Sequence, residues 1–214
     1  MQLFEENNNW ETKLLPLITK YKGKKHPLEY ANTYQLMIMV ILSAQDSDAN
    51  INKIAPAFFN RFPTLESIKS ISLEELYPYV SKVRNFNTKS TWILEIAQTL
   101  QTESAIPNNL NELIALKGIG RKSANVILRE SNAPAEGIIA DLHVIRVAPR
   151  IGLCPESKDG NKIEKQLMQL LPQNLWGEIG MAISFLGREI CRPTNPKCNQ
   201  CPLQNDCHYP LKTL

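Results

Sequence analysis

The stretch from Leu113 to Leu128 contains two glycines, Gly118 and Gly120, between two segments with helical periodicity. Apolar residues recur every three or four positions before Lys117 and resume after the glycines, as along one face of an amphipathic helix. We therefore predict two helices joined by a tight glycine turn. Glycines let a backbone approach a ligand closely, and the unpaired N–H groups that start the second helix attract phosphate.

Lys122 falls in the first turn of the second predicted helix. The positive end of the helix dipole and the neighbouring Arg121 disfavour the ammonium form there, which favours the free amine that a nucleophile needs. A nucleophilic lysine on a phosphate-binding turn indicates chemistry on nucleic acid, with DNA contacts from Lys117, Gly118, Gly120 and Arg121. This motif alone also fits an ordinary surface-helix lysine.

The composition suits a chain with its own core, because 43% of the 214 residues are hydrophobic. That length allows one large domain or two compact domains that share a cleft. The net charge of +3 is mild, so nucleic-acid binding would depend on a local basic face. The N-terminus has no signal-like pattern and no apolar run is long enough to span a membrane, so we expect a soluble intracellular protein.

The N-terminal half shows a series of helical segments. Asn9 is predicted to cap a helix that begins at Trp10 and that Pro16 interrupts. Residues 33–44 are apolar on all sides, as expected for a helix at the centre of a domain. Asp48 is predicted to cap the next helix.

Further capping patterns continue this series toward the C-terminus. The segment Ser72–Glu75 matches a capping box, and Asn109 is predicted to cap the first helix of the glycine turn. Three more helical segments follow Asp141. No stretch alternates with period two, so we predict an all-α fold.

Four of the five cysteines, Cys191, Cys198, Cys201 and Cys207, form a C-x6-C-x2-C-x5-C pattern in a polar loop. Disulfides are disfavoured in a reducing compartment. Structural zinc sites usually pair two short Cys-x2-4-Cys motifs, and this loop has one, so zinc stays an alternative while a [4Fe-4S] cluster suits the spacing better. Cys154 is predicted to be a buried small hydrophobe.

Three motifs together carry a family resemblance: Leu116–Leu128, Ile139–Val147, and Gly187–Cys191 with the cysteine pattern. The match extends upstream through Leu42–Asp48, so it covers nearly the whole chain. The chain resembles the endonuclease III branch of the helix-hairpin-helix DNA glycosylases.

This resemblance implies a two-domain helical protein with a DNA-binding cleft. Residues 27–134 would form a six-helix barrel domain, and residues 1–26 and 135–214 a cluster domain whose four cysteines hold the [4Fe-4S] cluster. Lys122 and Asp141 would lie on opposite walls of the cleft. Family members remove oxidised or ring-damaged pyrimidines from double-stranded DNA and then break the strand.

The resemblance also assigns roles to single residues. Lys122 would attack C1′ of the deoxyribose and form a Schiff base that permits β-elimination, and Asp141 would assist its deprotonation and stabilise charge on the sugar. Because the damaged nucleotide must be flipped out of the duplex, Gln45 would fill the gap and His143 would approach the opened pair. The alternatives are that Asp141 only caps a helix, Gln45 is an ordinary loop residue and His143 a surface histidine.

The sequence departs from the family pattern at several positions. Arg84 and Asn85 stand where many members have a glycine and an aliphatic wedge, and they would contact the opposite strand or simply face solvent. Lys117 replaces the usual proline, and Leu142 replaces a small hydroxyl residue. These changes concern lesion and opposite-base preference and leave the lyase chemistry intact.

The expected partner is double-stranded DNA that contains damaged bases or abasic sites, bound in part through phosphate contacts of Arg192 and Lys197. We expect a monomer in a prokaryotic cytoplasm, associated with the nucleoid. Two other functions remain open: a mismatch or adenine-type glycosylase, which would not use a lysine at position 122, and a non-catalytic cluster-bearing DNA-binding or redox module.

Overall fold

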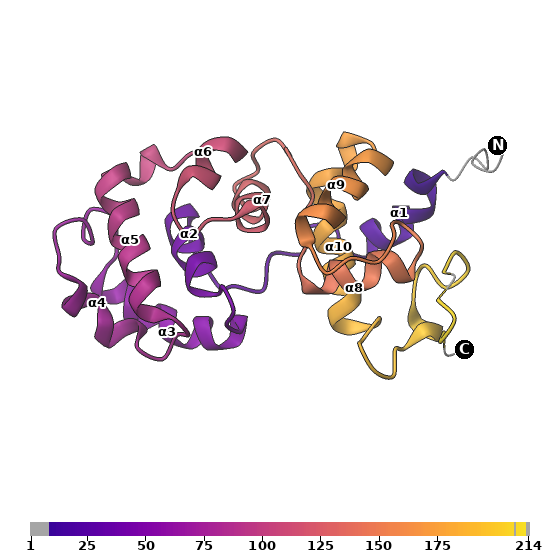
Figure 1. Ribbon diagram of the computed structural model, residues 1–214, viewed down its shortest axis with the longest axis horizontal. Helices are drawn as coiled ribbons and strands as arrows, with labels where there is room; N and C mark the ends of the chain where they lie inside the picture. The colour runs from indigo at the N-terminus through magenta and orange to yellow at the C-terminus, as the bar shows by residue number, and fades with distance from the viewer. Residues whose placement is uncertain (1–8, 208, 213–214) are drawn as a thin grey trace. The chain divides into compact units, whose positions relative to one another are not determined.

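The computed structural model describes residues 9–207 and 209–212, so the segment 1–8, on which the expectation of no targeting signal depends, lies outside them. The chain divides into two compact units: unit 1 comprises residues 1–24 and 135–214, and unit 2 comprises residues 25–134. Every regular element of the described residues is helical, which confirms the all-α prediction (Figure 1). None of the described helices is both long and apolar enough to cross a membrane.

Unit 2 is built around one apolar helix. Its elements are α2 (Thr33–Leu42), α3 (Asp48–Arg61), α4 (Leu73–Val80), α5 (Phe86–Leu100), a short 3-10 turn (Glu103–Ala105), α6 (Leu110–Ala115) and α7 (Arg121–Glu130). Helix α2 contacts α3, α5 and α7, and every residue from Leu36 to Leu42 is buried. The prediction of a central helix in this segment is therefore confirmed, although the helix ends at Leu42.

The helix starts of unit 2 largely follow the predicted capping patterns. The capping box at Ser72 forms, and the Asn109 side chain accepts a hydrogen bond from the backbone of Glu112 at 3.0 Å. The prediction for α3 was wrong by one residue, because Ser47 is the cap and Asp48 is the first helical residue. Ser47 has the extended backbone that suits a cap. The positive end of the helix dipole still stabilises the Asp48 carboxylate in the first turn.

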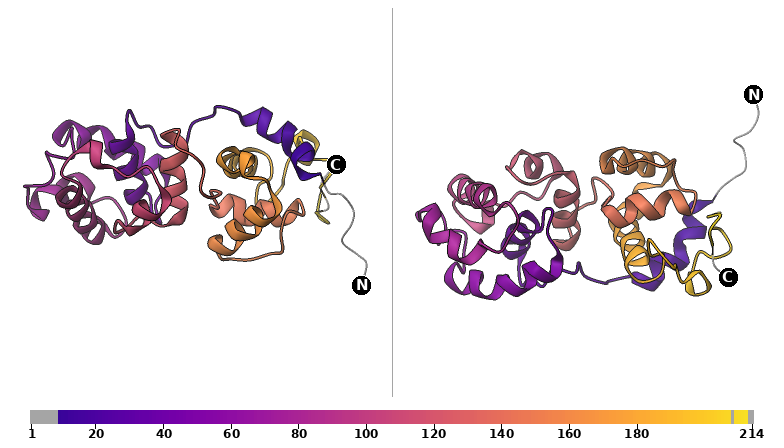
Figure 2. Two further views of the ribbon diagram at one scale, coloured as in Figure 1. Left: turned by 90° about the horizontal axis from the view of Figure 1, so that it is seen from above. Right: turned by 60° about the horizontal axis from the view of Figure 1, so that its bottom comes forward.

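Unit 1 joins the start of the chain to its C-terminal third. Its elements are α1 (Trp10–Tyr21), α8 (Leu142–Arg150), α9 (Gly160–Leu170), a 3-10 turn (Gln173–Leu175), α10 (Trp176–Glu189) and a second 3-10 turn (Cys198–Gln200). Helix α10 is the core element: it contacts α1 and α8, and residues 179–187 are buried (Figure 2). A Cβ at Gly180 would lie 2.6 Å from the Ile139 carbonyl oxygen, so glycine allows this close packing.

Helix α1 is continuous, so the prediction that Pro16 interrupts it was wrong. Pro16 lies on the exposed side, while Leu14, Leu17 and Tyr21 are buried. Packing of that apolar face and the hydrogen bond from the Tyr21 hydroxyl to Glu189 on α10, 3.0 Å long, offset the one backbone hydrogen bond that proline removes.

Candidate functional site

The glycine turn lies between α6 and α7 of unit 2, as the periodicity predicted. Gly118 has a φ of +82°, and a Cβ there would come within 2.5 Å of the Trp92 ring, so the fold itself requires glycine. Gly120 differs, because its φ of −88° suits any residue and nothing lies within 4 Å of a Cβ placed there. This exposed surface at the start of α7 leaves room for a ligand to approach the helix N-terminus.

Lys122 is the second residue of α7 and its side chain is exposed, whereas the preceding Arg121 is half-buried. Lys117, in the turn, is exposed as well, but its Nζ lies 2.9 Å from Glu95 Oε2. The hairpin therefore presents the Lys122 amine to solvent. A phosphate that binds Lys117 would compete with the Glu95 carboxylate.

Gln45 and Asn85 lie in two different loops of unit 2. Both are exposed, and both have a left-handed backbone, with φ of 58° and 57°. Arg84 is also exposed, and its backbone N–H donates to Asp46 Oδ2 at 3.0 Å. The structure thus brings two predicted contact segments together through Asp46, which the sequence analysis did not single out.

In unit 1, the two carboxylate oxygens of Asp141 have different partners. Oδ1 accepts hydrogen bonds from the backbone N–H groups of His143 and Val144, at 2.8 and 2.9 Å, so Asp141 does cap α8. Oδ2 accepts a hydrogen bond from Ser184 Oγ at 2.6 Å and lies 3.9 Å from Arg188 Nη2. The carboxylate is therefore fixed in one orientation by α8 and α10 together.

Ser184 and Arg188 are the residues that sequence reasoning missed at this carboxylate. Ser184 is fully buried on α10, and Arg188 follows one turn later. The available signal was a hydroxyl within the buried segment Ile179–Gly187 of α10, followed one turn later by a guanidinium, because buried polar groups need partners.

His143 is half-buried beside this carboxylate. Its Nδ1 lies 3.3 Å from Arg146 Nη2, and a Cβ added at Gly187 on α10 would come within 2.8 Å of its Cβ. His143 is therefore held by packing of α8 against α10. Leu142, directly after Asp141, is 79% exposed.

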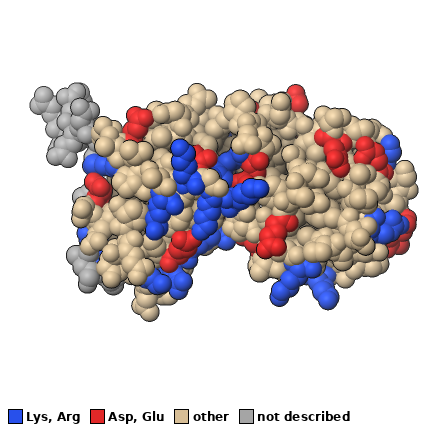
Figure 3. Space-filling view, turned by 180° about the vertical axis from the view of Figure 1, so that it is seen from behind, with Lys and Arg blue, Asp and Glu red and all other residues tan. Residues whose placement is uncertain are grey.

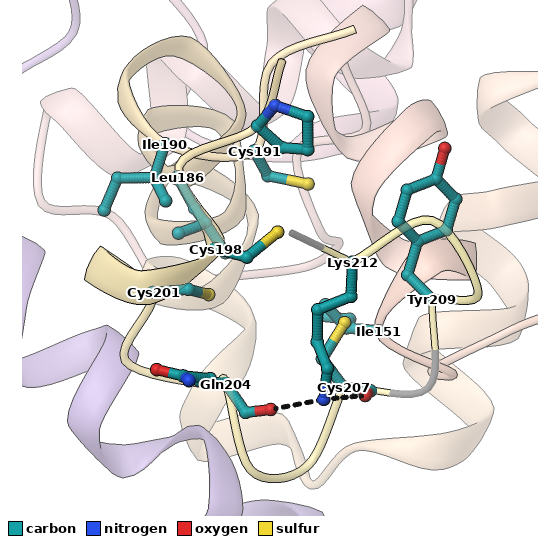
Figure 4. A pocket seen from close by; sticks show the side chains of 11 residues that line it. Ile151, Leu186, Ile190, Cys191, Cys198, Cys201, Gln204, Cys207, Tyr209 and Lys212 are labelled. Atoms are coloured by element: carbon teal, nitrogen blue, oxygen red, sulfur yellow. Dashed lines mark hydrogen bonds between the residues drawn. The ribbon is translucent and has the colours of Figure 1, made fainter. Parts of the chain in front are cut away.

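The four cysteines of the C-terminal loop, Cys191, Cys198, Cys201 and Cys207, line one pocket in unit 1 (Figure 4). The pocket is also lined by Ile151, Leu186, Ile190, Pro196, Gln204, Tyr209 and Lys212. Among the described residues, no group of three or more His, Cys, Asp or Glu side chains is arranged to hold a metal ion. The four cysteine side chains therefore share one pocket.

Burial raises the pKa of the Cys191 thiol, and Arg150, whose Nη1 lies 3.8 Å from Cys191 Sγ, opposes that effect. Burial also raises the pKa of the Cys201 thiol. Cys154 does not line the pocket; it is half-buried rather than fully buried, and burial raises its pKa to about 11.

Arg192 and Lys197, in the cysteine loop, are both exposed. Their backbones are anchored, because the Arg192 carbonyl accepts a hydrogen bond from Arg150 at 2.9 Å and the Lys197 N–H donates to the Ile190 carbonyl at 3.0 Å. Figure 3 shows several Lys and Arg side chains close together on one face, with Asp and Glu side chains between them, although the net charge is only +3. Positive charge is thus concentrated locally, as phosphate binding requires.

Comparison with known proteins places this geometry in a family. The model of the HhH-GPD superfamily base excision DNA repair proteins matches residues 38–173. Two proteins named endonuclease III, from Synechocystis sp. and Rickettsia prowazekii, are 32% and 33% identical to the chain. The alignments cover 92% and 94% of this chain and 90% and 96% of the relatives. The chain belongs to the endonuclease III family.

Solved structures of endonuclease III have the same fold. A non-covalent endonuclease III–DNA complex aligns with a TM-score of 0.80 at 31% identity, and a trapped endonuclease III–DNA covalent intermediate with a TM-score of 0.82 at 30% identity. Each alignment covers 94% of both chains. A thermostable thymine-DNA glycosylase, with a TM-score of 0.78 at 17% identity, shares the fold alone.

Proposed function

We propose that this endonuclease III family member is a DNA glycosylase with AP-lyase activity, which removes damaged pyrimidines from double-stranded DNA and then cleaves the strand. The observation that carries this proposal is Lys122, an exposed amine in the first turn of α7, directly after the open surface at Gly120. Both residues lie within the region that matches the superfamily model.

In the proposed reaction, the Lys122 amine attacks C1′ of a flipped nucleotide and the C1′–N bond to the base breaks. The base leaves with the bonding electron pair and is protonated, while the amine loses its proton to Asp141. The aminal that results opens as the C1′–O4′ bond breaks and O4′ takes up a proton, which leaves a Schiff base between Lys122 and C1′. This Schiff base acidifies the C2′ hydrogen, and removal of that hydrogen as a proton expels the 3′ phosphate by β-elimination. The fixed Asp141 carboxylate also stabilises positive charge that develops on the sugar.

Several other residues are proposed to bind the DNA. The glycine turn, Arg121, Arg192 and Lys197 would contact phosphates. Gln45 would fill the space left by the flipped base, and His143 would approach the opened base pair. Arg84 and Asn85 would contact the opposite strand.

We also propose a [4Fe-4S] cluster as the resident cofactor, held by the four cysteines whose thiols line one pocket. The donor set suits it, because a cubane cluster takes four thiolates, each on a different iron atom. When bound, the cluster would order a loop that has few apolar residues of its own. The protein is proposed to act as a monomer in the cytoplasm.

The test is covalent trapping with borohydride on duplexes that carry a damaged pyrimidine or an abasic site. Wild type should form a trapped complex and cleave the strand. Lys122→Gln should abolish trapping and cleavage while DNA binding persists, because it removes the nucleophile alone. Asp141→Asn should slow cleavage by about a hundredfold or more.

The matched control is Lys165→Gln, which replaces an exposed lysine on α9 outside the candidate site. It should trap and cleave as wild type does. Wild-type cleavage by Lys122→Gln would overturn the assignment, and base release without trapping would indicate a glycosylase that lacks lyase activity.

A further inference from the structure

The loops that carry Gln45 and Asn85 share an unusual backbone feature. Both residues are in the left-handed region, with φ of 58° and 57°, and both side chains are exposed. Non-glycine residues rarely adopt this conformation; asparagine tolerates it best, and glutamine is less suited. Such a conformation persists only where the surrounding contacts enforce it.

Asp46 supplies contacts to both loops. Its Oδ1 accepts from the Ser47 backbone N–H at 2.8 Å and from Asn50 Nδ2 at 3.0 Å, while its Oδ2 accepts from the Arg84 backbone N–H at 3.0 Å. Asn50 Nδ2 also donates to the Lys82 carbonyl at 3.3 Å. Asp46 directly follows Gln45, and Arg84 directly precedes Asn85. The hydrogen bond between Asp46 and Arg84 therefore connects the two loops.

Lys89 holds the same loop from inside the unit. It is 2% exposed, and its Nζ donates to the carbonyls of Leu42 and Ala44 at 2.7 and 2.6 Å. Burial lowers the pKa of Lys89, and Asp46 acts in the opposite direction. Leu42 is the last residue of α2 and Ala44 directly precedes Gln45, so Lys89 ties the loop to the end of that helix. Since burying a cation is costly, these two hydrogen bonds indicate that Lys89 maintains the geometry of the loop.

We propose that Asp46 and Lys89 are positioning residues that hold Gln45 and Asn85 as one rigid pair of amides, which recognises the undamaged base left without a partner when the damaged nucleotide is flipped. Each amide carries a donor and an acceptor and can match the edge of a base. This inference rests on the proposed function. It predicts that the two amides contribute to binding cooperatively and that Asp46 carries the coupling between them.

The experiment measures dissociation constants for duplexes with a tetrahydrofuran abasic analogue opposite each of the four bases, so that no cleavage is needed. Gln45→Ala, Asn85→Ala and the double variant are compared in the wild-type and Asp46→Ala backgrounds. In the wild-type background the double variant should deviate from additivity on the order of tenfold. In the Asp46→Ala background the deviation should vanish, and the four affinities should become nearly equal.

Three variants separate positioning from general stability. Asp46→Asn keeps one acceptor oxygen, which suffices for the Arg84 N–H but not for every partner of the carboxylate, so it should retain part of the difference between opposite bases. Lys89→Met should lose that difference. Glu74→Ala, which replaces an exposed carboxylate on α4, should behave as wild type. Helical circular dichroism checks that each variant is folded.

Two results would count against these ideas in different ways. If folded Asp46→Ala keeps the four affinities in their wild-type ratios, or if the two amides are additive in wild type, Asp46 does not couple them and the inference is wrong. If wild type does not prefer the abasic analogue to intact duplex, the proposed function itself fails and the inference falls with it.

Discussion

Asp141 shows how one residue can serve both a structural and a proposed chemical role. Oδ1 caps α8, and Oδ2 accepts the 2.6 Å hydrogen bond from Ser184, with Arg188 nearby. A helix cap alone needs only one of these oxygens. The additional partners from α10 hold the second oxygen in place, which is useful if that oxygen must accept a proton in a defined direction.

We therefore expect Ser184→Ala to slow single-turnover strand cleavage about tenfold, because a charge-assisted hydrogen bond of about 1.5–3 kcal/mol is lost. The dissociation constant for abasic-analogue DNA should change little, since Ser184 is buried and cannot contact DNA. Ser184→Thr keeps the hydroxyl and should retain most of the rate.

Ser90→Ala is the matched control for that variant. Ser90 is a buried serine on α5 whose Oγ has no hydrogen-bond partner among the described residues. Its removal should leave the cleavage rate unchanged. Equal rates for Ser184→Ala and Ser90→Ala would show that Ser184 does not position the carboxylate.

At the scale of elements, the fold requires glycine at position 118 but not at position 120, and substitutions should show this difference. Gly118→Ala should lower the free energy of unfolding by about 1–3 kcal/mol, because a side chain at φ +82° is strained and meets the Trp92 ring. Gly120→Ala should cost no more than about 1 kcal/mol, since its backbone and surroundings accept a Cβ. Urea denaturation measures both values.

For DNA binding, Gly120 should matter more than its small effect on stability suggests. If a phosphate approaches the start of α7 there, Gly120→Ala should weaken binding of abasic-analogue DNA although the fold is intact. Unchanged affinity in Gly120→Ala would indicate that no DNA backbone comes close to this turn.

The cysteine loop is the second element with its own prediction. Anaerobically purified protein should be brown and contain about four iron and four sulfide per chain. Cys201→Ser should lose iron and expose the loop to proteases, because the cluster supplies the folding energy that apolar residues do not. Cys154→Ser should keep its iron, since Cys154 does not line the pocket. Zinc without iron would contradict the assignment.

At the scale of the whole molecule, the proposed phosphate contacts come from both units, although the net charge is only +3. Affinity for DNA should therefore fall steeply as salt increases. Arg192→Ala and Lys197→Ala should each reduce the slope of log affinity against log salt by about one unit. Each variant should weaken binding by the same factor whatever the DNA sequence, because phosphate contacts do not read bases. Unchanged slopes in both variants would remove the cysteine loop from the interface.

The sequence by itself predicted whatever depends on neighbours within a few positions. The all-α fold, the central helix α2, the caps at Asn9 and Asn109 and the helical hairpin all follow from periodicity and local hydrogen bonding. The errors at Pro16 and Asp48 are also local. Packing of the apolar face keeps α1 continuous through Pro16, and the cap of α3 falls one residue earlier, at Ser47, whose side chain accepts a hydrogen bond from the Asn50 backbone.

Only the tertiary structure decided which distant groups meet. The partnership of Ser184 with Asp141, the junction that Asp46 makes with Arg84, and the pairing of Lys117 with Glu95 join residues on different helices or loops. No short motif encodes such contacts, since they depend on how one helix packs against another. The sequence thus determined which residue types are available for chemistry, and packing determined which partners hold them in place.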